Sequence, residues 1–258
     1  AYDSVADSTV SVTTSDDDTA SFTLSGTNIT ISEAGSTTTF TAVLGAQPSS
    51  DVVLGVSSAD TGEATVSPAQ LTFTNSDWNS AQTVTVTGVD DSLIDGNQTT
   101  AVTVSVVDTS SDNAFDALAD QTVTATTTDD DTAAFTLSGT NVTVTEAGST
   151  TTFTAVLGAQ PSSDVVLGVS SADTGEATVS PAQLTFTNSD WNSAQTVTVT
   201  GVNDDLADGN QTTAVTVSVV DTSSDNAFDA LADQTVTATT SDDDSPGIST
   251  TETSGSTS

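Results

Sequence analysis

The chain of 258 residues carries 36 acidic side chains and no lysine, arginine or histidine, which gives a formal net charge of −36. Without histidine, cysteine, lysine or arginine it lacks an imidazole base, a thiol nucleophile, a Schiff-base amine and a phosphate clamp, so we expect no enzyme activity. The charge excludes nucleic acid and anionic membrane surfaces as partners, and no apolar run approaches the ~20 residues of a membrane span.

An Asp triplet divides the sequence into tandem repeats. It occurs at residues 16–18, 129–131 and 242–244, and residues 19–131 match residues 132–244 at all but eight of 113 positions. Residues 1–18 match 114–131, so we interpret them as the final strand of a preceding repeat. Residues 245–258 are interpreted as the start of a further repeat. The chain is therefore expected to be a window on a longer protein.

Taken in chain order, the residue pattern of each repeat predicts seven short strands rich in Thr and β-branched residues. The first is an edge strand split by Gly26 into 20–25 and 28–32, and the others cover 37–44, 51–57, 70–74, 82–89, 100–107 and 121–127. Residues 58–68 are predicted to be a loop. Thr is expected on the outward face of the strands, and Val, Leu and Phe on the inward face. The fold class is therefore all-β, with tandem antiparallel β-sandwich repeats of immunoglobulin-like size.

Antiparallel strand order brings four acidic segments of each repeat to the same end of its sandwich. We name this end the acidic pole. In the first repeat its carboxylates are Glu33, Asp60, Glu63, Asp90, Asp91, Asp95, Asp129, Asp130 and Asp131. In the second repeat they are Glu146, Asp173, Glu176, Asp204, Asp205, Asp208, Asp242, Asp243 and Asp244. Asp225 or Asp229, in the last long loop of the second repeat, could add ligands.

Two interpretations of this acidity are open. Solvated loop acids that repel one another are one, and a cation site is the other. A charge of this density favours either disorder or bound cations, and the regular alternation of apolar residues favours a folded chain. Oxygen ligands without any nitrogen or sulfur donor select Ca²⁺ over zinc or copper. We therefore predict several Ca²⁺ ions at each repeat joint.

The acidic segments also resemble a known family. The EAG of residues 33–35, the acidic 58–68 loop, the DD-x-x-x-D-G of residues 90–96 and the closing DDD together resemble the Calx-β domain, a calcium-binding sandwich of sodium-calcium exchangers and large bacterial surface proteins. The stretch at 67–91 and the DDDSPGI at 242–248 are similar to the variant found in tandem in bacterial adhesins. The resemblance implies calcium ligands at Glu33, Glu63, Asp91, Asp95 and Asp129 to Asp131, and at Glu146, Glu176, Asp204, Asp208 and Asp242 to Asp244.

The expected function is structural: a calcium-rigidified extracellular segment that forms the stalk of a large adhesin or the body of a surface filament, at the cell surface of a prokaryote. Its expected partners are neighbouring repeats and other copies of the chain. Two alternatives are a filament subunit joined by strand addition and a calcium-dependent module that binds a glycan or protein. Asn28, Asn97, Asn141 and Asn210 lie in N-glycosylation sequons, whose use the sequence leaves open.

Overall fold

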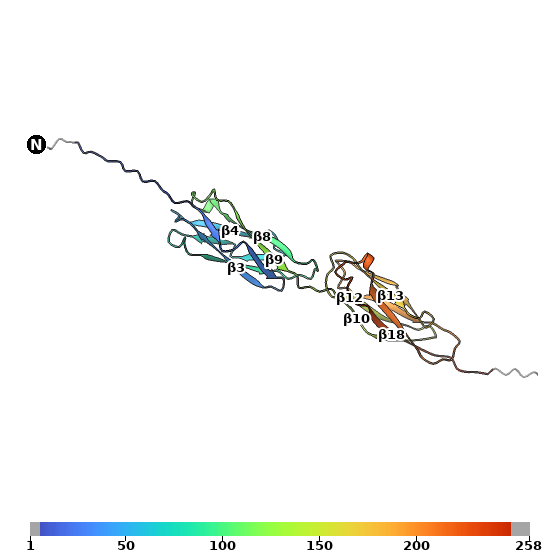
Figure 1. Cartoon of the computed structure of the whole chain (residues 1–258). Coiled ribbons are helices and arrows are strands. Elements are labelled where there is room, and N and C mark those ends of the chain that lie inside the picture. The colour runs from blue at the N-terminus through green and yellow to red at the C-terminus, as the bar shows by residue number, and fades with distance from the viewer. Residues whose placement is uncertain (1–5, 249–258) are drawn as a thin grey trace, which may run out of the picture. The chain divides into compact units, whose positions relative to one another are not determined.

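The computed structural model describes residues 6–248. By its contacts the chain divides into two compact units. The first contains the residues up to Asp90 together with Asn97–Thr128, and the second contains Asp91–Gly96 together with the residues from Asp129 on. Each unit contains one β-sandwich of two packed layers (Figure 1). The all-β prediction is confirmed, since the described helices are two single turns, η1 (Asp108–Ser110) and η2 (Asp221–Ser223).

The two sandwiches share one strand plan. The strands of the first are β1 (Phe22–Leu24), β2 (Asn28–Ser32), β3 (Thr37–Leu44), β4 (Val52–Ser58), β5 (Ala64–Ser67), β6 (Gln70–Phe73), β7 (Gln82–Gly88), β8 (Gln98–Val106) and β9 (Gln121–Thr128). Those of the second are β10 (Phe135–Leu137), β11 (Asn141–Thr145), β12 (Thr150–Leu157), β13 (Val165–Ser171), β14 (Ala177–Ser180), β15 (Gln183–Phe186), β16 (Gln195–Gly201), β17 (Gln211–Val219) and β18 (Gln234–Ser241).

In each sandwich a four-stranded sheet packs against a five-stranded sheet. The strand orders are β1-β3-β7-β5 and β2-β9-β8-β4-β6 in the first, with β10-β12-β16-β14 and β11-β18-β17-β13-β15 in the second. The described strand pairs are antiparallel except β2 with β9 and β11 with β18, which are parallel. The split edge strand is therefore present as predicted, but each half joins a different sheet.

The core follows the alternation of the strands. In β16, for example, Val197 and Val199 are completely buried, while the alternating Thr198 and Thr200 are partly exposed. Phe153, Phe186 and Phe228 are the largest fully buried apolar side chains of the second core. Period-two burial of this kind fixes strand register, because a slip of one residue would expose the whole apolar face.

The prediction of a loop at residues 58–68 is wrong in its second half, and the repeat has nine strands in place of seven. Residues 64–67 form β5, which pairs with β7, and the chain then crosses to the other sheet and continues in the same direction as β6. The fully buried Ala64 anchors β5. Four residues between acidic neighbours and Pro68 give too short a pattern to distinguish a strand from a loop.

Several threonines also contradict the prediction of an outward face. Thr100, Thr127, Thr213 and Thr240 are buried. Each of them occupies a position of its strand whose side chain points inward. Thr240, for example, lies two residues after the buried Ala238 and four after the buried Val236. Strand parity outweighs the preference of a hydroxyl for solvent, because the hydroxyls find partners in the neighbouring loops.

The chain segments outside the two sandwiches carry no strand where they are described. Residues 6–18, predicted to be the final strand of an earlier repeat, have no regular secondary structure and are exposed, with Val10 at 86% and Val12 at 80% of full exposure. Of the predicted further repeat, residues 245–248 have no regular structure and residues 249–258 lie outside the described part of the chain. No helix among the described residues has the length and apolar character to cross a membrane.

A buried carboxylate braces the loop opposite the acidic pole. Asp225 accepts hydrogen bonds from the backbone N–H and hydroxyl of Ser162 at 2.8 and 2.6 Å, and from the backbone N–H groups of Ser163 and Ala227 at 3.0 Å each. Burial raises the pKa of this carboxyl, but these donors outweigh burial and leave the pKa below its usual value. The carboxylate of Asp225 is thus satisfied by protein donors.

Candidate metal centre

The parallel pairing of β11 with β18 assembles the acidic pole of the second sandwich. Its register places Thr145 beside Ser241, the last residues of the two strands. The next residue of each strand is acidic, and the backbone N–H of Glu146 donates to the carbonyl of Ser241 at 3.1 Å. Two segments almost 100 residues apart in sequence therefore deliver Glu146 and Asp242 to the same point.

Two glycines with positive φ shape the loops around this point. Gly148 has φ +82° and allows the tight turn after β11, in which its N–H donates to the carbonyl of Thr145 at 3.2 Å. Gly209 has φ +77°, and its N–H donates to Oδ2 of Asp242 at 2.7 Å. Side-chain-bearing residues rarely adopt this conformation, so glycine is required where the loop meets the carboxylate.

Three carboxylates form the centre of the pole. Glu146, Asp243 and Asp244 each offer one oxygen, and these oxygens all lie within 4.8 Å of one another. Glu146 is 1% exposed. Within the described part of the chain, Oε2 of Glu146 and Oδ2 of Asp244 are buried and have no hydrogen-bond partner. Buried carboxylate oxygens without donors are costly, and this chain has no cationic side chain to pair with them.

The pKa values of three carboxyl groups in the pole are raised by burial and by neighbouring negative charges, which no positive charge compensates. Burial raises the pKa of Glu146 above its usual value, and the neighbouring Asp242, Asp204 and Asp208 add to the rise, although a backbone hydrogen bond from Asp243 opposes it. Burial likewise raises the pKa of Glu176, assisted by the negative charges of Asp208, Asp173 and Asp204. The pKa of Asp244 is raised by burial and then by Asp243, Asp205, Asp242 and Asp204. A bound cation would reverse each of these effects.

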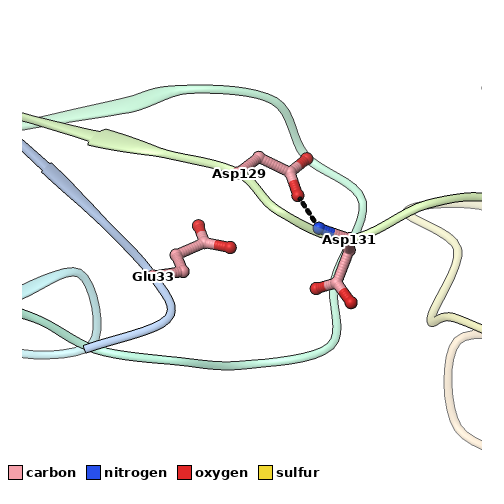
Figure 2. A group of neighbouring side chains, drawn as sticks. All are labelled: Glu33, Asp129 and Asp131. Carbon is pink, nitrogen blue, oxygen red and sulfur yellow. Dashed lines mark hydrogen bonds between the residues drawn. The ribbon is translucent and has the colours of Figure 1, made fainter. Parts of the chain in front are cut away.

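The first repeat has a similar group made of Glu33, Asp129 and Asp131, whose oxygens also lie within 4.8 Å of one another. The two groups share the positions of Glu33/Glu146 and Asp131/Asp244 and differ in the third carboxylate. Figure 2 shows the carboxylate of Glu33 turned toward these two aspartates. Oδ1 of Asp129 accepts a hydrogen bond from the backbone N–H of Asp131 at 2.8 Å (Figure 2), and Oδ2 accepts one from Gly96. Glu33 is buried, like its counterpart Glu146.

The other predicted ligands do not belong to these two groups. Asp60 and Asp173 cap their own loops, accepting hydrogen bonds from the N–H groups of Gly62 and Gly175 at 2.8 and 2.9 Å. Asp91 and Asp204 do the same for Leu93 and Leu206 at 2.7 Å each. Asp90, Asp95, Asp130, Asp205 and Asp208 are exposed. Glu63 and Glu176 are half-buried, and their backbone carbonyls accept hydrogen bonds from Thr127 and Thr240.

Two buried threonines position the 172–176 loop, and the sequence reasoning missed them. The hydroxyl of Thr240 donates to the carbonyl of Glu176 at 3.1 Å, and Thr213 accepts a hydrogen bond from the N–H of Asp173 at 2.9 Å. Their inward parity in β18 and β17 is the signal that would have identified them. Asn203 stands where the first repeat has Asp90, and its side-chain amide donates to the carbonyl of Asp204 at 2.9 Å.

The residues present fit a hard divalent cation. All the side-chain atoms that could bind a metal here are carboxylate oxygens, and Ca²⁺ and Mg²⁺ prefer oxygen ligands. Glu146 and Asp244 each present a buried oxygen that no protein donor satisfies within the described chain. The three oxygens near one another, with Asp204, Asp208 and Asp242 around them, are sufficient in number and charge to replace part of the hydration shell of such an ion.

Comparisons with known proteins place the chain in no family. No protein-family model matches it, and no curated protein matches it either. Similar solved structures include domains 4 and 5 of the S-layer protein SbsC, 17% identical over 87% of this chain and 100% of that one, with a TM-score of 0.37. Calcium-binding domain CBD12 of CALX1.1 is 12% identical over 77% and 78% of the two chains, with a TM-score of 0.35. At TM-scores this low, the likenesses say nothing about what this chain binds.

Proposed function

We propose that the two sandwiches are calcium-stabilised structural repeats of an extracellular stalk or surface filament. The observation that carries the proposal is the carboxylate of Glu146, which is 1% exposed and whose Oε2 has no hydrogen-bond partner among the described residues. In a chain without lysine, arginine or histidine, compensation for that charge has to come from solution. A divalent cation bound to oxygen ligands is the compensation that its surroundings favour.

A structural role follows from where such an ion would act. It would join the end of β11, through Glu146, to the segment after β18, through Asp243 and Asp244. The ion would therefore tie together the first and last parts of one repeat, as a disulfide does in other secreted domains. No residue of the pole is assigned a catalytic role in this proposal.

The extracellular setting is supported by the type of site. Carboxylate sites of extracellular modules bind Ca²⁺ with dissociation constants of about 10⁻⁴ to 10⁻³ M, which suits millimolar calcium and not the cytosol. Part of this pole is open to water, since Asp243, Asp205 and Asp208 are exposed. We therefore expect a calcium affinity in that range.

The proposal is tested by thermal unfolding of the whole chain, followed by circular dichroism, in saturating Ca²⁺ and in excess chelator. Ligand at 100 times its dissociation constant stabilises the folded state by about 2.7 kcal/mol per site. For a domain of this size that corresponds to a rise in Tm of roughly 10 to 20 °C. Equilibrium dialysis of the same samples should show Ca²⁺ bound to both sandwiches.

Sodium chloride and Mg²⁺ at matched ionic strength are the controls. Screening of the −36 charge alone would stabilise the chain equally with every salt of the same ionic strength. A Tm that responds identically to Ca²⁺ and to matched NaCl would show that the acidic pole is a solvated surface, and the proposal would be abandoned.

A further inference from the structure

Each sandwich carries a polar hollow at the end away from its acidic pole. In the second sandwich Asp164 directly precedes β13 and lines the hollow, whereas Asp173 of the acidic pole follows the other end of that strand. We name this feature the serine hollow. Its volume is about 470 Å³ in the second sandwich and about 500 Å³ in the first. Both volumes lie within the range of about 300 to 1,000 Å³ that is usual for small-molecule sites.

The serine hollow belongs to each repeat by itself. In the second repeat it is lined by Ser162, Ser163, Asp164, Asn188, Ser223 and Ser224, and in the first by the six residues 113 positions earlier in the chain. All six come from one compact unit. Each has the same exposure as its counterpart, although only the second repeat follows a complete sandwich. The exposure of the hollow therefore does not depend on whether another sandwich precedes the repeat.

The walls of the hollow are held in place by the protein itself. Oδ2 of the buried Asp225 accepts a hydrogen bond from the N–H of Ser163 at 3.0 Å. The hydroxyl of Ser224 makes hydrogen bonds to the backbone of β13 at 3.0 and 3.3 Å. The side-chain amide of Gln160 donates to the carbonyl of Asn188 at 2.9 Å. The three segments that form the hollow are therefore ordered without a ligand, which lowers the entropy cost of binding one.

Four lining side chains are left with unused hydrogen-bonding groups. Ser163, Asp164, Asn188 and Ser223 line the hollow, and their side chains make no hydrogen bond within the described part of the chain. They supply one carboxylate, one amide and two hydroxyls. A carboxylate only accepts hydrogen bonds, whereas an amide and a hydroxyl both donate and accept them. The hollow thus offers donors and acceptors together.

This composition excludes most classes of ligand. No lining residue is apolar, so an apolar ligand would leave the polar groups without partners. An anion would meet a carboxylate and no cationic side chain, because the chain has none. A metal ion would find one carboxylate here, whereas the acidic pole brings three carboxylate oxygens within 4.8 Å of one another. A neutral ligand with several hydroxyl groups remains.

We propose that the serine hollow binds a neutral saccharide, with Asp164 and Asn188 as its main contacts. One sugar hydroxyl donates to the carboxylate of Asp164, and a neighbouring hydroxyl accepts from the amide of Asn188. The hydroxyls of Ser163 and Ser223 rotate to donate or accept as the ligand requires. The hollow of the first sandwich offers the same groups, so each chain has two such sites. This binding function is separate from the calcium site of the acidic pole.

The test is saturation-transfer difference NMR on the full chain in saturating Ca²⁺. The probes are the methyl glycosides of glucose, galactose, mannose and N-acetylglucosamine, each titrated to obtain a dissociation constant. No aromatic side chain lines the hollow, and its polar groups must lose water, so we expect dissociation constants on the order of millimolar. Tetramethylammonium chloride is the probe for a hollow that binds cations instead of sugars.

Variants with altered carboxylates locate the binding. D51N/D164N changes the carboxylate of both hollows and should weaken binding of the preferred glycoside roughly tenfold, because a hydrogen bond to a charged group is lost. D120N/D233N is the matched control, since it removes the same charge from two exposed residues outside the hollows. It should leave the dissociation constant unchanged.

A second variant, N75A/N188A, removes the amide and keeps the charge, and it should weaken sugar binding to a similar extent. Circular dichroism checks that each variant is folded. The proposal is overturned if none of the four glycosides binds, if both hollow variants bind sugar as the unaltered chain does, or if only tetramethylammonium binds. These variants keep every carboxylate of the acidic pole, so the response of Tm to Ca²⁺ tests the calcium proposal independently.

Discussion

Glu146 combines burial with a neighbourhood that contains only negative side chains, so its charge should be unfavourable until a cation binds. We predict opposite effects of E146Q in the two ionic conditions. In chelator the neutral amide should raise Tm, because it removes a desolvated charge beside Asp204, Asp208 and Asp242. In calcium it should lower Tm and weaken Ca²⁺ binding at least roughly tenfold, since even indirect neighbours of a metal contribute that much.

Asp233→Asn is the matched control for this prediction, because Asp233 is exposed and follows the loop braced by Asp225. It should leave calcium binding unchanged. Tm values measured by circular dichroism for both variants, with and without calcium, give the comparison. A loss of stability for E146Q in chelator would mean that the carboxylate serves a protein contact, against the cation site inferred for it.

At the scale of residues, the sequence indicates which acids gather but not which of them are buried. Every carboxylate predicted for the second pole lies near Glu146, Glu176 or Asp244 closely enough to influence a pKa. Only the structure distinguishes the buried Glu146 from the exposed Asp205. Both are acidic loop residues in sequence, and their difference arises from the parallel pairing of β11 with β18, which no local pattern reports.

At the scale of elements, the short edge strand β11 carries Glu146 to the pole, and it approaches β16 closely at Gly201. A Cβ at Gly201 would overlap the carbonyl oxygen of Thr145, the last residue of β11. We predict that G201A pushes this strand end away and costs about 1 to 3 kcal/mol, as overpacking does elsewhere. Because Glu146 follows directly, calcium affinity should fall as well.

Gly139→Ala is the control, since nothing lies within 4 Å of the position of its Cβ and its φ is not in the left-handed range. Urea unfolding of G201A and G139A, with calcium titration of each, separates the two effects. If G201A binds calcium with unchanged affinity despite a loss of stability, the strand end does not position the ligand.

Strand alternation predicted most elements to within two residues, because period-two burial of Val and Phe is strong in β3, β7 and β8 and their counterparts. It failed where an element is short. β5 and β14 contain four residues each, and they are stabilised by pairing with β7 and β16, which lie far away in sequence. The local sequence of a strand that is stabilised mainly by its pairing partner contains little pattern from which the strand could be predicted.

At the scale of the whole molecule, 36 acidic groups without a single cationic side chain make stability depend on the pH of the solution. The pKa values of Glu146, Glu176 and Asp244 are raised in the folded state, so in chelator the folded chain binds more protons than the unfolded chain below those values. Stability should therefore increase as pH falls through the raised pKa values toward the ordinary carboxyl range.

The opposite contribution comes from Asp112, whose pKa is held at about 2 by hydrogen bonds from Ala114, Ser49 and Ser50. Its stabilisation is complete above the ordinary carboxyl pKa and is lost only as pH falls from there to about 2. It therefore does not affect the range in which the acidic pole titrates.

We predict a reversal of the pH dependence when calcium is present. In chelator, the free energy of unfolding in urea should rise as the pH falls toward the ordinary carboxyl range, because buried carboxyls with raised pKa values take up protons there. In saturating Ca²⁺ it should fall over the same range, because protons compete with the ion for Glu146 and Asp244. Parallel slopes in the two conditions would mean that the groups that titrate are not the groups that bind the ion.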